Sequence, residues 1–297
     1  MLVTGGAGFI GSHLVDALLA RGDEVAVVDH LKRPPRQWVA DAMSRRMRLH
    51  VADVRDLEGL RGAFAAARPE VVLHLAAQAD VRRSVADPAF DASVNVAGTV
   101  AVLEASVQSG VGRVVLASTA AVYGDPEQLP TPEDAPIAPL SPYGTSKAAA
   151  EWYLGQYTRL HGISTLALRM ANVYGPRQDP HGEAGVIAIF TGAAAEGRRV
   201  QVYGDGRQTR DYIHVADVVR AWLLAAESGA QDAINVSTGV ESTVLDLTAA
   251  LELEHDDRPA RPGEIERSCL DPGRAAAELG WRADVALTEG LRRTRDG

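Results

Sequence analysis

The stretch Leu2-Val3-Thr4-Gly5-Gly6-Ala7-Gly8-Phe9-Ile10-Gly11 decides the fold of this chain. A short apolar run leads directly into glycines and then into a helical pattern over Ile10–Arg21, which predicts a strand, a tight turn and a helix. Glycines in such a turn let the backbone approach a pyrophosphate, whose charge is stabilised by exposed N–H groups and by the positive end of the helix. The residues of this turn that we predict to bind a dinucleotide are Gly5, Gly8, Phe9, Ile10 and Gly11.

A carboxylate lies where the next strand ends. Val25–Asp29 predicts the second strand, and Asp29 stands 24 positions beyond Gly5. A carboxylate at this place accepts hydrogen bonds from an adenosine ribose and repels a 2′-phosphate. The pattern therefore favours NAD as cofactor over NADP. The alternative is a strand–helix turn without a ligand, with Asp29 solvated.

A second acidic residue follows the third predicted strand, Arg48–Val51. There, Asp53-Val54 is placed where a side chain meets the adenine amino group of a dinucleotide. Asp53 is equally suited to cap the helix that begins near Leu57, and the two roles are compatible.

Apolar runs and helical patterns alternate along the first part of the chain, which indicates βαβ units and a parallel sheet. Most of the apolar runs lack period-two alternation, as expected of strands covered on both faces. The predicted strands are residues 2–4, 25–29, 48–51, 71–75, 114–117 and 165–169, and the predicted helices are residues 10–21, 57–67, 90–109 and 146–161.

The pattern changes after Asn172, where elements become shorter and turns more frequent. We predict an α/β fold with a Rossmann-type doubly wound parallel sheet in residues 1–171 and a smaller, irregular C-terminal substrate domain in residues 172–297. The segment of about residues 211–238 is predicted to rejoin the sheet. It would do so as a strand at 212–215, a helix at 218–227 and a strand at 233–236.

Composition excludes several classes of partner. The chain has 297 residues, 46% hydrophobic content and a net charge of −9, which is typical of a folded globular protein and argues against nucleic acid or an anionic membrane as partner. No run approaches the about 18 unbroken apolar residues of a membrane span. The lone Cys269 cannot form an intrachain disulfide, so we predict a cytoplasmic protein. The histidines show no metal-ligand spacing, and no metal is predicted.

Tyr143-Gly144-Thr145-Ser146-Lys147 places a tyrosine and a lysine four residues apart, on one face of a helix that begins near Pro142. A neighbouring ammonium and a positively charged nicotinamide ring would lower the pKa of a tyrosine from about 10 toward neutrality, which makes it a base. An isolated pair of this kind is usually a surface feature. Here, however, Lys147 is one of only two lysines among 30 basic residues.

Two hydroxyl residues, Ser118 and Thr119, end the predicted strand at 114–117. The carboxyl edge of an open α/β sheet is where ligands bind, so Thr119 is predicted to hydrogen-bond a reacting hydroxyl. Ser118 is its close rival, and turn formation is the alternative for both.

These motifs together resemble the extended short-chain dehydrogenase/reductase family, and within it the UDP-glucose 4-epimerases. The resemblance covers essentially the whole chain. Besides the segments quoted above, it rests on Leu75-Ala76-Ala77-Gln78, Asn95-Val96-Ala97-Gly98-Thr99, Ser118-Thr119-Ala120-Ala121-Val122-Tyr123-Gly124, Asn172-Val173-Tyr174-Gly175-Pro176 and Thr209-Arg210-Asp211-Tyr212-Ile213-His214-Val215.

The resemblance implies NAD-dependent epimerisation at C4 of a UDP-hexose through a 4-keto sugar. Thr119, Tyr143 and Lys147 would be catalytic, with Tyr143 the base. Val54, Leu75, Ala76, Ala77 and Asn95 would join the cofactor site, together with Asp53, Tyr143 and Lys147. The implied substrate contacts are Ser118, Thr119, Tyr143, Asn172, Gln201, Tyr203, Arg210 and Arg261, the two arginines on the diphosphate.

Several alternatives stay open. Ala120 and Ala121 follow Thr119 where the family's dehydratases carry an acidic residue, which disfavours dehydration. A UDP-glucuronate 4-epimerase or another sugar-nucleotide oxidoreductase of the family is the second possibility, and a non-catalytic NAD-sensing protein is the third. Ser268 stands where some relatives carry a bulky tyrosine, so the UDP-N-acetylhexosamines are further candidate substrates. A homodimer is implied by the family.

Overall fold

A computed structural model describes residues 1–31, 37–179, 185–260 and 265–296 of the chain. Its centre is a seven-stranded parallel sheet with the order β10-β6-β5-β4-β1-β2-β3. The strands are β1 (Leu2–Thr4), β2 (Ala26–Asp29), β3 (Arg48–Val51), β4 (Val71–His74), β5 (Arg113–Thr119), β6 (Ser164–Met170) and β10 (Asp232–Val236). From β1 and β4 the strands wind outward in opposite directions, which confirms the predicted doubly wound fold and puts the topological switch point between these two strands.

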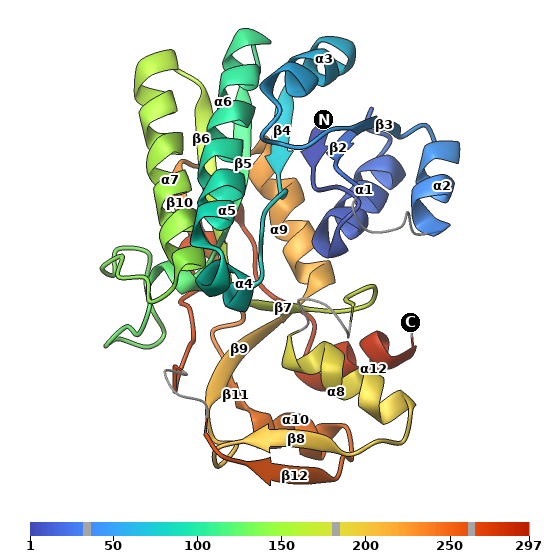
Figure 1. Cartoon of the computed structure of the whole chain (residues 1–297), viewed down its shortest axis with the longest axis vertical. Coiled ribbons are helices and arrows are strands. Elements are labelled where there is room, and N and C mark those ends of the chain that lie inside the picture. Colours follow the sequence, from blue (N-terminus) through green and yellow to red (C-terminus); the bar gives the residue numbers. More distant parts are fainter. Residues whose placement is uncertain (32–36, 180–184, 261–264, 297) are drawn as a thin grey trace.

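Helices cover both faces of this sheet (Figure 1). One face carries α1 (Phe9–Arg21), α9 (Val215–Glu227) and α11 (Gly273–Leu279), with α2 (Gln37–Ser44) beside α1; the other carries α3 (Leu57–Ala67), α6 (Gly98–Gln108) and α7 (Pro142–His161). Each face has its own core of fully buried aliphatic side chains, with Val3 and Val115 facing one and Leu2 and Val114 facing the other. Strands buried on both faces explain why the sequence shows continuous apolar runs.

The helix predicted over residues 90–109 is confirmed and contains a π-helical turn. The structure has α4 (Val81–Ala86), then α5 (Pro88–Ala92), a π-helical turn η1 (Ser93–Ala97) and α6, which run on as one rod over Pro88–Gln108. This rod is the one helical stretch of the described residues that is long and apolar enough to cross a membrane, and 44% of an apolar 18-residue window within it is buried inside the protein. It packs against α3 and α7, as a core helix of the sheet layer does.

A smaller part of the chain forms the lower half of Figure 1. It contains a three-stranded sheet of order β11-β9-β7 and a two-stranded sheet of β12 and β8. Its elements are β7 (Asn172–Tyr174), α8 (Val186–Ala195), β8 (Val200–Tyr203), β9 (Thr209–His214), β11 (Glu241–Thr243), α10 (Val244–Ala250), β12 (His255–Arg258) and α12 (Leu287–Asp296). A separate core around Phe190, Tyr212 and Leu247 holds these elements together.

One prediction for the segment 211–238 is wrong. The strand expected at 212–215 lies in β9, which pairs with β7 and β11 and not with the large sheet. The buried carboxylate of Asp211 explains this placement, because it accepts hydrogen bonds from Thr238 and Gly239 and so holds β9 beside the turn after β10. The rest of the segment, α9 and β10, does return to the large sheet, where β10 pairs with β6.

Candidate active site

The glycine turn after β1 is tightly folded against the end of β4. Gly5 has φ of +69°, and a Cβ there would lie 2.7 Å from the Ala76 nitrogen; a Cβ on Gly11 would lie 2.2 Å from the Gly5 oxygen. Gly8 is the N-cap of α1, and neither a capping side chain nor an acidic residue occupies the first turn of that helix. The turn therefore presents backbone at a helix N-terminus, which is the arrangement that binds a pyrophosphate.

Asp29 holds this turn in place. One carboxylate oxygen accepts a hydrogen bond from the Ala7 N–H at 3.0 Å, and the other accepts from the Leu31 N–H at the same distance. Its side chain keeps 11% of its surface exposed, and each carboxylate oxygen has a second lone pair. Asp29 thus organises the loop whatever else it binds, and its contact with an adenosine ribose stays a prediction.

A chain of buried hydrogen bonds ties the switch-point strands to α6. The Thr4 hydroxyl lies 2.7 Å from His74 Nδ1, and His74 Nε2 lies 3.0 Å from the hydroxyl of Thr99. Thr99 donates to the Asn95 carbonyl, so it accepts from Nε2–H and His74 is the neutral Nε2–H tautomer. Burial lowers the pKa of His74 to about 3, which agrees with a permanently neutral ring. His74 is therefore a buried structural residue that connects β1, β4 and α6.

The cofactor residues predicted after β3 and β4 differ in burial and in their contacts. Asp53 is not the cap of α3: Asp56 takes that role by accepting from the Gly59 N–H, and Asp53 pairs with Arg55. Val54 is buried against Gly98, where a Cβ would lie 2.8 Å from a Val54 methyl group. Leu75, Ala76 and Ala77 are half-buried in the segment that follows β4, next to the glycine turn.

Asn95 has a structural role that the sequence did not reveal. It lies in the π-helical turn η1 and is 1% exposed. Its Oδ1 accepts from the Gln78 N–H, and its Nδ2 donates to the Gln78 carbonyl, to Asp91 and to Ser146. Asn95 thereby positions the segment after β4 against α7, and its contact with the cofactor stays a prediction.

The two predicted hydroxyl residues have different partners in the structure. Ser118 is buried and donates a hydrogen bond to Glu151, and its contact with a substrate stays a prediction. Thr119 is half-buried at the end of β5, and its Oγ1 accepts from the Ala121 N–H as the cap of η2 (Ala120–Val122). Thr119 is thus the more exposed of the two hydroxyl residues, and its role in the reaction stays a prediction.

Helix α7 begins where the sequence predicts, with Pro142 as its first residue. The Ser141 hydroxyl caps it by accepting from the Gly144 N–H. Gly144 lies so close to η2 that a Cβ would be 2.5 Å from the Ala121 oxygen. This close approach places Tyr143 at the end of β5 that carries Thr119, and Lys147 follows one helical turn later.

Lys147 is 3% exposed and donates a hydrogen bond from Nζ to the Ala117 carbonyl at 2.9 Å. Burial lowers its pKa to about 8, and the negative charges of Asp91 and Glu151 oppose this shift. An ammonium with a pKa this close to neutrality can lose or regain its proton near physiological pH.

The predicted substrate residues lie in the smaller part of the molecule. Asn172 and Gln201 are exposed, Tyr203 and Arg210 are half-buried, and the Tyr203 hydroxyl donates to Gln201 at 3.0 Å. Arg210 stands on β9, whose next residue donates its N–H to the Ser268 carbonyl, so Ser268 is close to Arg210 in the fold. The prediction for Arg261 lies outside the described residues.

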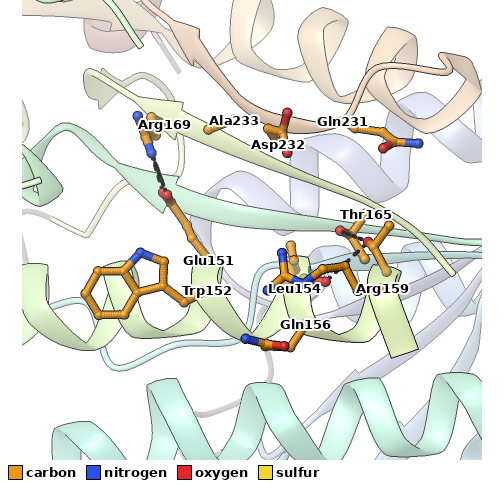
Figure 2. Close-up of a pocket in the computed structure, with 12 residues that line it drawn as sticks. Glu151, Trp152, Leu154, Gln156, Arg159, Thr165, Arg169, Gln231, Asp232 and Ala233 are labelled. Carbon is orange, nitrogen blue, oxygen red and sulfur yellow. Dashed lines mark hydrogen bonds and ion pairs between the residues drawn. The ribbon is translucent and has the colours of Figure 1, made fainter. Parts of the chain in front are cut away.

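A cavity of about 490 Å³ lies between α7 and the edge of the sheet at β6 and β10 (Figure 2). It is lined by Glu151, Trp152 and Arg169 among others, and by none of the residues predicted to bind cofactor or substrate. Among the described residues, no group of three or more His, Cys, Asp and Glu side chains is placed to hold a metal ion.

Comparison with known proteins identifies the family of this chain. Residues 1–237 match the model of the NAD dependent epimerase/dehydratase family. A UDP-glucose 4-epimerase of Mycolicibacterium smegmatis is 47% identical over 99% of this chain and 96% of its own length.

Solved structures agree with this comparison. A UDP-glucose 4-epimerase of Thermotoga maritima, determined with UDP-glucose, matches with a TM-score of 0.94 and 44% identity over 99% of this chain and 97% of its own. A UDP-glucose 4-epimerase of Thermus thermophilus, in complex with NAD, matches with a TM-score of 0.92 and 45% identity over the same shares.

Proposed function

This chain belongs to the NAD-dependent epimerase/dehydratase family, and from that membership and the site geometry we propose that it is an NAD-dependent UDP-hexose 4-epimerase. The substrates would be UDP-glucose and UDP-galactose. The observation that carries the proposal is the convergence of Thr119, Tyr143 and Lys147 at the carboxyl end of β5, which β4 separates from β1 and its glycine turn.

The residues of the glycine turn fit the cofactor. Side chains at Gly5 and Gly11 would collide with the backbone, and the first turn of α1 has no capping side chain, so the cradle accommodates a pyrophosphate. When bound, NAD supplies the chemistry of the reaction by taking a hydride from C4 of the sugar and returning it to the opposite face. Asp29 would accept from the adenosine ribose.

The chain's own residues move and hold the proton. Tyr143 would take the proton of the C4 hydroxyl as the sugar becomes a 4-keto sugar, and would return it after the sugar has turned over. Thr119 would donate a hydrogen bond to the same oxygen. The Lys147 ammonium, fixed on the Ala117 carbonyl, would stabilise the phenolate of Tyr143 and orient the nicotinamide ribose.

Epimerisation requires a firmly held nucleotide and a loosely held sugar. Arg210 and Arg261 would anchor the diphosphate through paired donors, with Asn172 nearby and Gln201 and Tyr203 beside the uracil. Ala120 and Ala121, in η2 after Thr119, carry no group that could protonate a leaving hydroxyl, which supports epimerisation over dehydration.

We also propose that the protein is a cytoplasmic homodimer that pairs through α6 and α7. Three large side chains on α7 support this surface, since Trp152, Tyr153 and Leu160 are 64%, 42% and 72% exposed. Light scattering after gel filtration would give the mass of the assembly.

The function is tested by following the anomeric proton NMR signals of UDP-glucose, UDP-N-acetylglucosamine and UDP-glucuronate in turn with the purified protein. We expect the signals of UDP-galactose to appear without added cofactor, and NAD(H) to be released only on denaturation. Tyr143→Phe should abolish turnover and retain the cofactor. Turnover of UDP-glucuronate alone, or consumption of external cofactor, would support the alternative enzymes, and Tyr143→Phe at the wild-type rate would refute the mechanism.

A further inference from the structure

A buried carboxylate, Glu151, stands one helical turn beyond Lys147 on α7 and has no role in the chemistry described above. Its side chain is 10% exposed and lies against the carboxyl ends of β5 and β6. Glu151 therefore faces two strands of the sheet while its own helix carries Tyr143 and Lys147.

Both carboxylate oxygens of Glu151 accept hydrogen bonds within the protein. The Ser118 hydroxyl donates to Oε1. Arg169 donates from Nε to both carboxylate oxygens, at 3.1 and 3.2 Å, and from Nη2 to Oε2 at 2.7 Å. Figure 2 shows Glu151 extending from α7 to Arg169 at the wall of the cavity. A planar guanidinium held by two oxygens fixes the carboxylate in direction as well as in position.

Arg169 is itself held from behind. Its Nη1 donates to the Tyr123 hydroxyl at 2.7 Å and to the Glu133 carbonyl at 3.0 Å, and Tyr123 donates onward to Asn235 on β10. Burial raises the pKa of Tyr123 to about 12, so it stays a neutral donor. The ion pair is thus connected by hydrogen bonds to three strands of the sheet, β5, β6 and β10. These contacts hold α7 in a fixed position against the sheet.

We propose that Glu151 is a positioning residue for the reaction, which clamps the Ser118–Thr119 end of β5 to α7 and places a carboxylate one helical turn from the Lys147 ammonium. Thr119 is bonded covalently to Ser118, and Lys147 donates to the carbonyl of Ala117, the residue before Ser118. The hydrogen bond from Ser118 to Glu151 therefore fixes the end of β5 against α7. It positions Thr119 and the Ala117 carbonyl, which accepts from Lys147, relative to this helix.

The charge of Glu151 acts on the same group. Three titratable side chains interact electrostatically with Lys147: Asp91 from α5, His74 from β4 and Glu151 from α7. Tyr143 precedes Lys147 by one turn on α7. His74 is neutral, so Asp91 and Glu151 supply the negative charge that opposes the effect of burial on the pKa of Lys147. Without the Glu151 charge, the ammonium would lose its proton at a lower pH.

The decisive measurement is a titration of Lys147 that does not depend on turnover. The chain has two lysines, so protein labelled with ¹³C-lysine gives two Cε signals, and a Lys32→Arg variant assigns them. We expect Glu151→Gln to lower the midpoint of the Lys147 titration by about one pH unit. The proposal rests on the proposed function only for its kinetic part, in which Glu151→Gln should lower kcat about tenfold and change KM for UDP-glucose less than about twofold.

Thr165→Val is the matched control. Thr165 on β6 shares a hydrogen bond of 2.7 Å with Thr158 on α7, so the variant also breaks a contact between this helix and this strand, but away from Lys147. It should leave both the lysine titration and kcat unchanged. Because Glu151→Gln leaves a buried guanidinium without its carboxylate and can fail to fold, Glu151→Gln combined with Arg169→Met removes both charges and should show the same titration shift.

Ser118→Ala tests the clamp. If Ser118 acts through Glu151, Ser118→Ala and Glu151→Gln together should lower kcat no more than Glu151→Gln alone. Multiplying losses would overturn the clamp, and a Lys147 midpoint equal to that of the Thr165→Val protein would overturn the charge role. A wild-type protein that does not epimerise UDP-glucose refutes the proposed function, and the titration still decides the role of Glu151.

Discussion

Gly144 offers a sharp test of how the site is assembled. It is the third residue of α7, directly after Tyr143, and it lies against η2, which follows Thr119. A Cβ at this position would lie 2.5 Å from the Ala121 oxygen and 2.9 Å from Cβ of Pro139. Gly144→Ala therefore separates the two elements that carry the proposed catalytic hydroxyls, without removing any functional group.

The size of the effect follows from these distances. Real Cβ atoms do not approach other atoms within 3.0 Å, so the first turn of α7 and η2 must separate by at least 0.5 Å. A misplacement of about 1 Å costs about 100-fold in rate, so we expect kcat to fall by about 10- to 100-fold. Overpacking costs about 1–3 kcal/mol, while alanine gains about 1 kcal/mol over glycine within a helix. The net loss of stability is thus about 0–2 kcal/mol.

The assay compares Gly144→Ala with Gly155→Ala, a second glycine of the same helix. A Cβ at Gly155 would lie 3.6 Å from Nη1 of Arg159, which is ordinary van der Waals contact. Gly155→Ala should raise the free energy of unfolding by about 0.5–1 kcal/mol and leave kcat unchanged. The initial rate at saturating UDP-glucose, the NAD retained after gel filtration and the Tm are measured for each protein.

The reasoning is refuted if Gly144→Ala retains the wild-type kcat, because the close approach of α7 to η2 would then not position Tyr143. A fall in kcat matched by a proportional loss of folded protein would equally contradict it, since the effect would be one of stability. A Gly155→Ala protein that loses kcat would show that the whole helix, and not its first turn, sets the rate.

Two further predictions concern Lys147 and Asp29. Because burial lowers the pKa of Lys147 to about 8 and the proposed mechanism needs its ammonium, kcat should fall as the pH rises above about 8, and a kcat that stays level to pH 10 would contradict the role of the charge. Asp29→Ala leaves the N–H groups of Ala7 and Leu31 without their acceptor, so the protein should lose about 1–3 kcal/mol of stability and release NAD on gel filtration; undiminished NAD retention would show that the glycine turn holds its shape without this carboxylate.

The large sheet could be predicted because each of its elements is encoded locally. An apolar run such as Val71–His74 needs no distant partner to be recognised, and the alternation of such runs with helical patterns predicts a parallel sheet. The order of its strands comes from the structure. The β8 and β12 pair could not be found in this way. β12 has the sequence His-Asp-Asp-Arg and is largely exposed, so it lacks the apolar pattern of a strand. It becomes a strand by pairing with Val200–Tyr203, which is distant in the sequence.

The site was predictable to a similar degree. Tyr143 and Lys147 are linked by a helical spacing that the sequence displays, and Glu151 continues the same spacing by one turn, so that signal was available. The partners of Glu151 and Asn95 were not: Ser118 is 33 residues from Glu151, and Gln78 is 17 residues from Asn95. Only the folded sheet edge brings these groups together, so the sequence did not show the hydrogen bonds that Ser118 and Asn95 make within the protein.

The different roles of arginine and lysine in this chain are seen at the carboxyl end of β5, where Lys147 is buried. Arginines on the described surface pair with carboxylates, as Arg199 does with Glu254 and Asp256, where a planar, permanently charged fork is suitable. Lys147 has a different task, because its buried Nζ donates to the single carbonyl of Ala117 and its pKa is lowered to about 8. A guanidinium would keep its charge there but would bring five donors to that space. Only a compact ammonium, whose charge depends on the carboxylates of Asp91 and Glu151, can be tuned beside Tyr143, so Lys147→Arg should preserve the charge and still lose the rate.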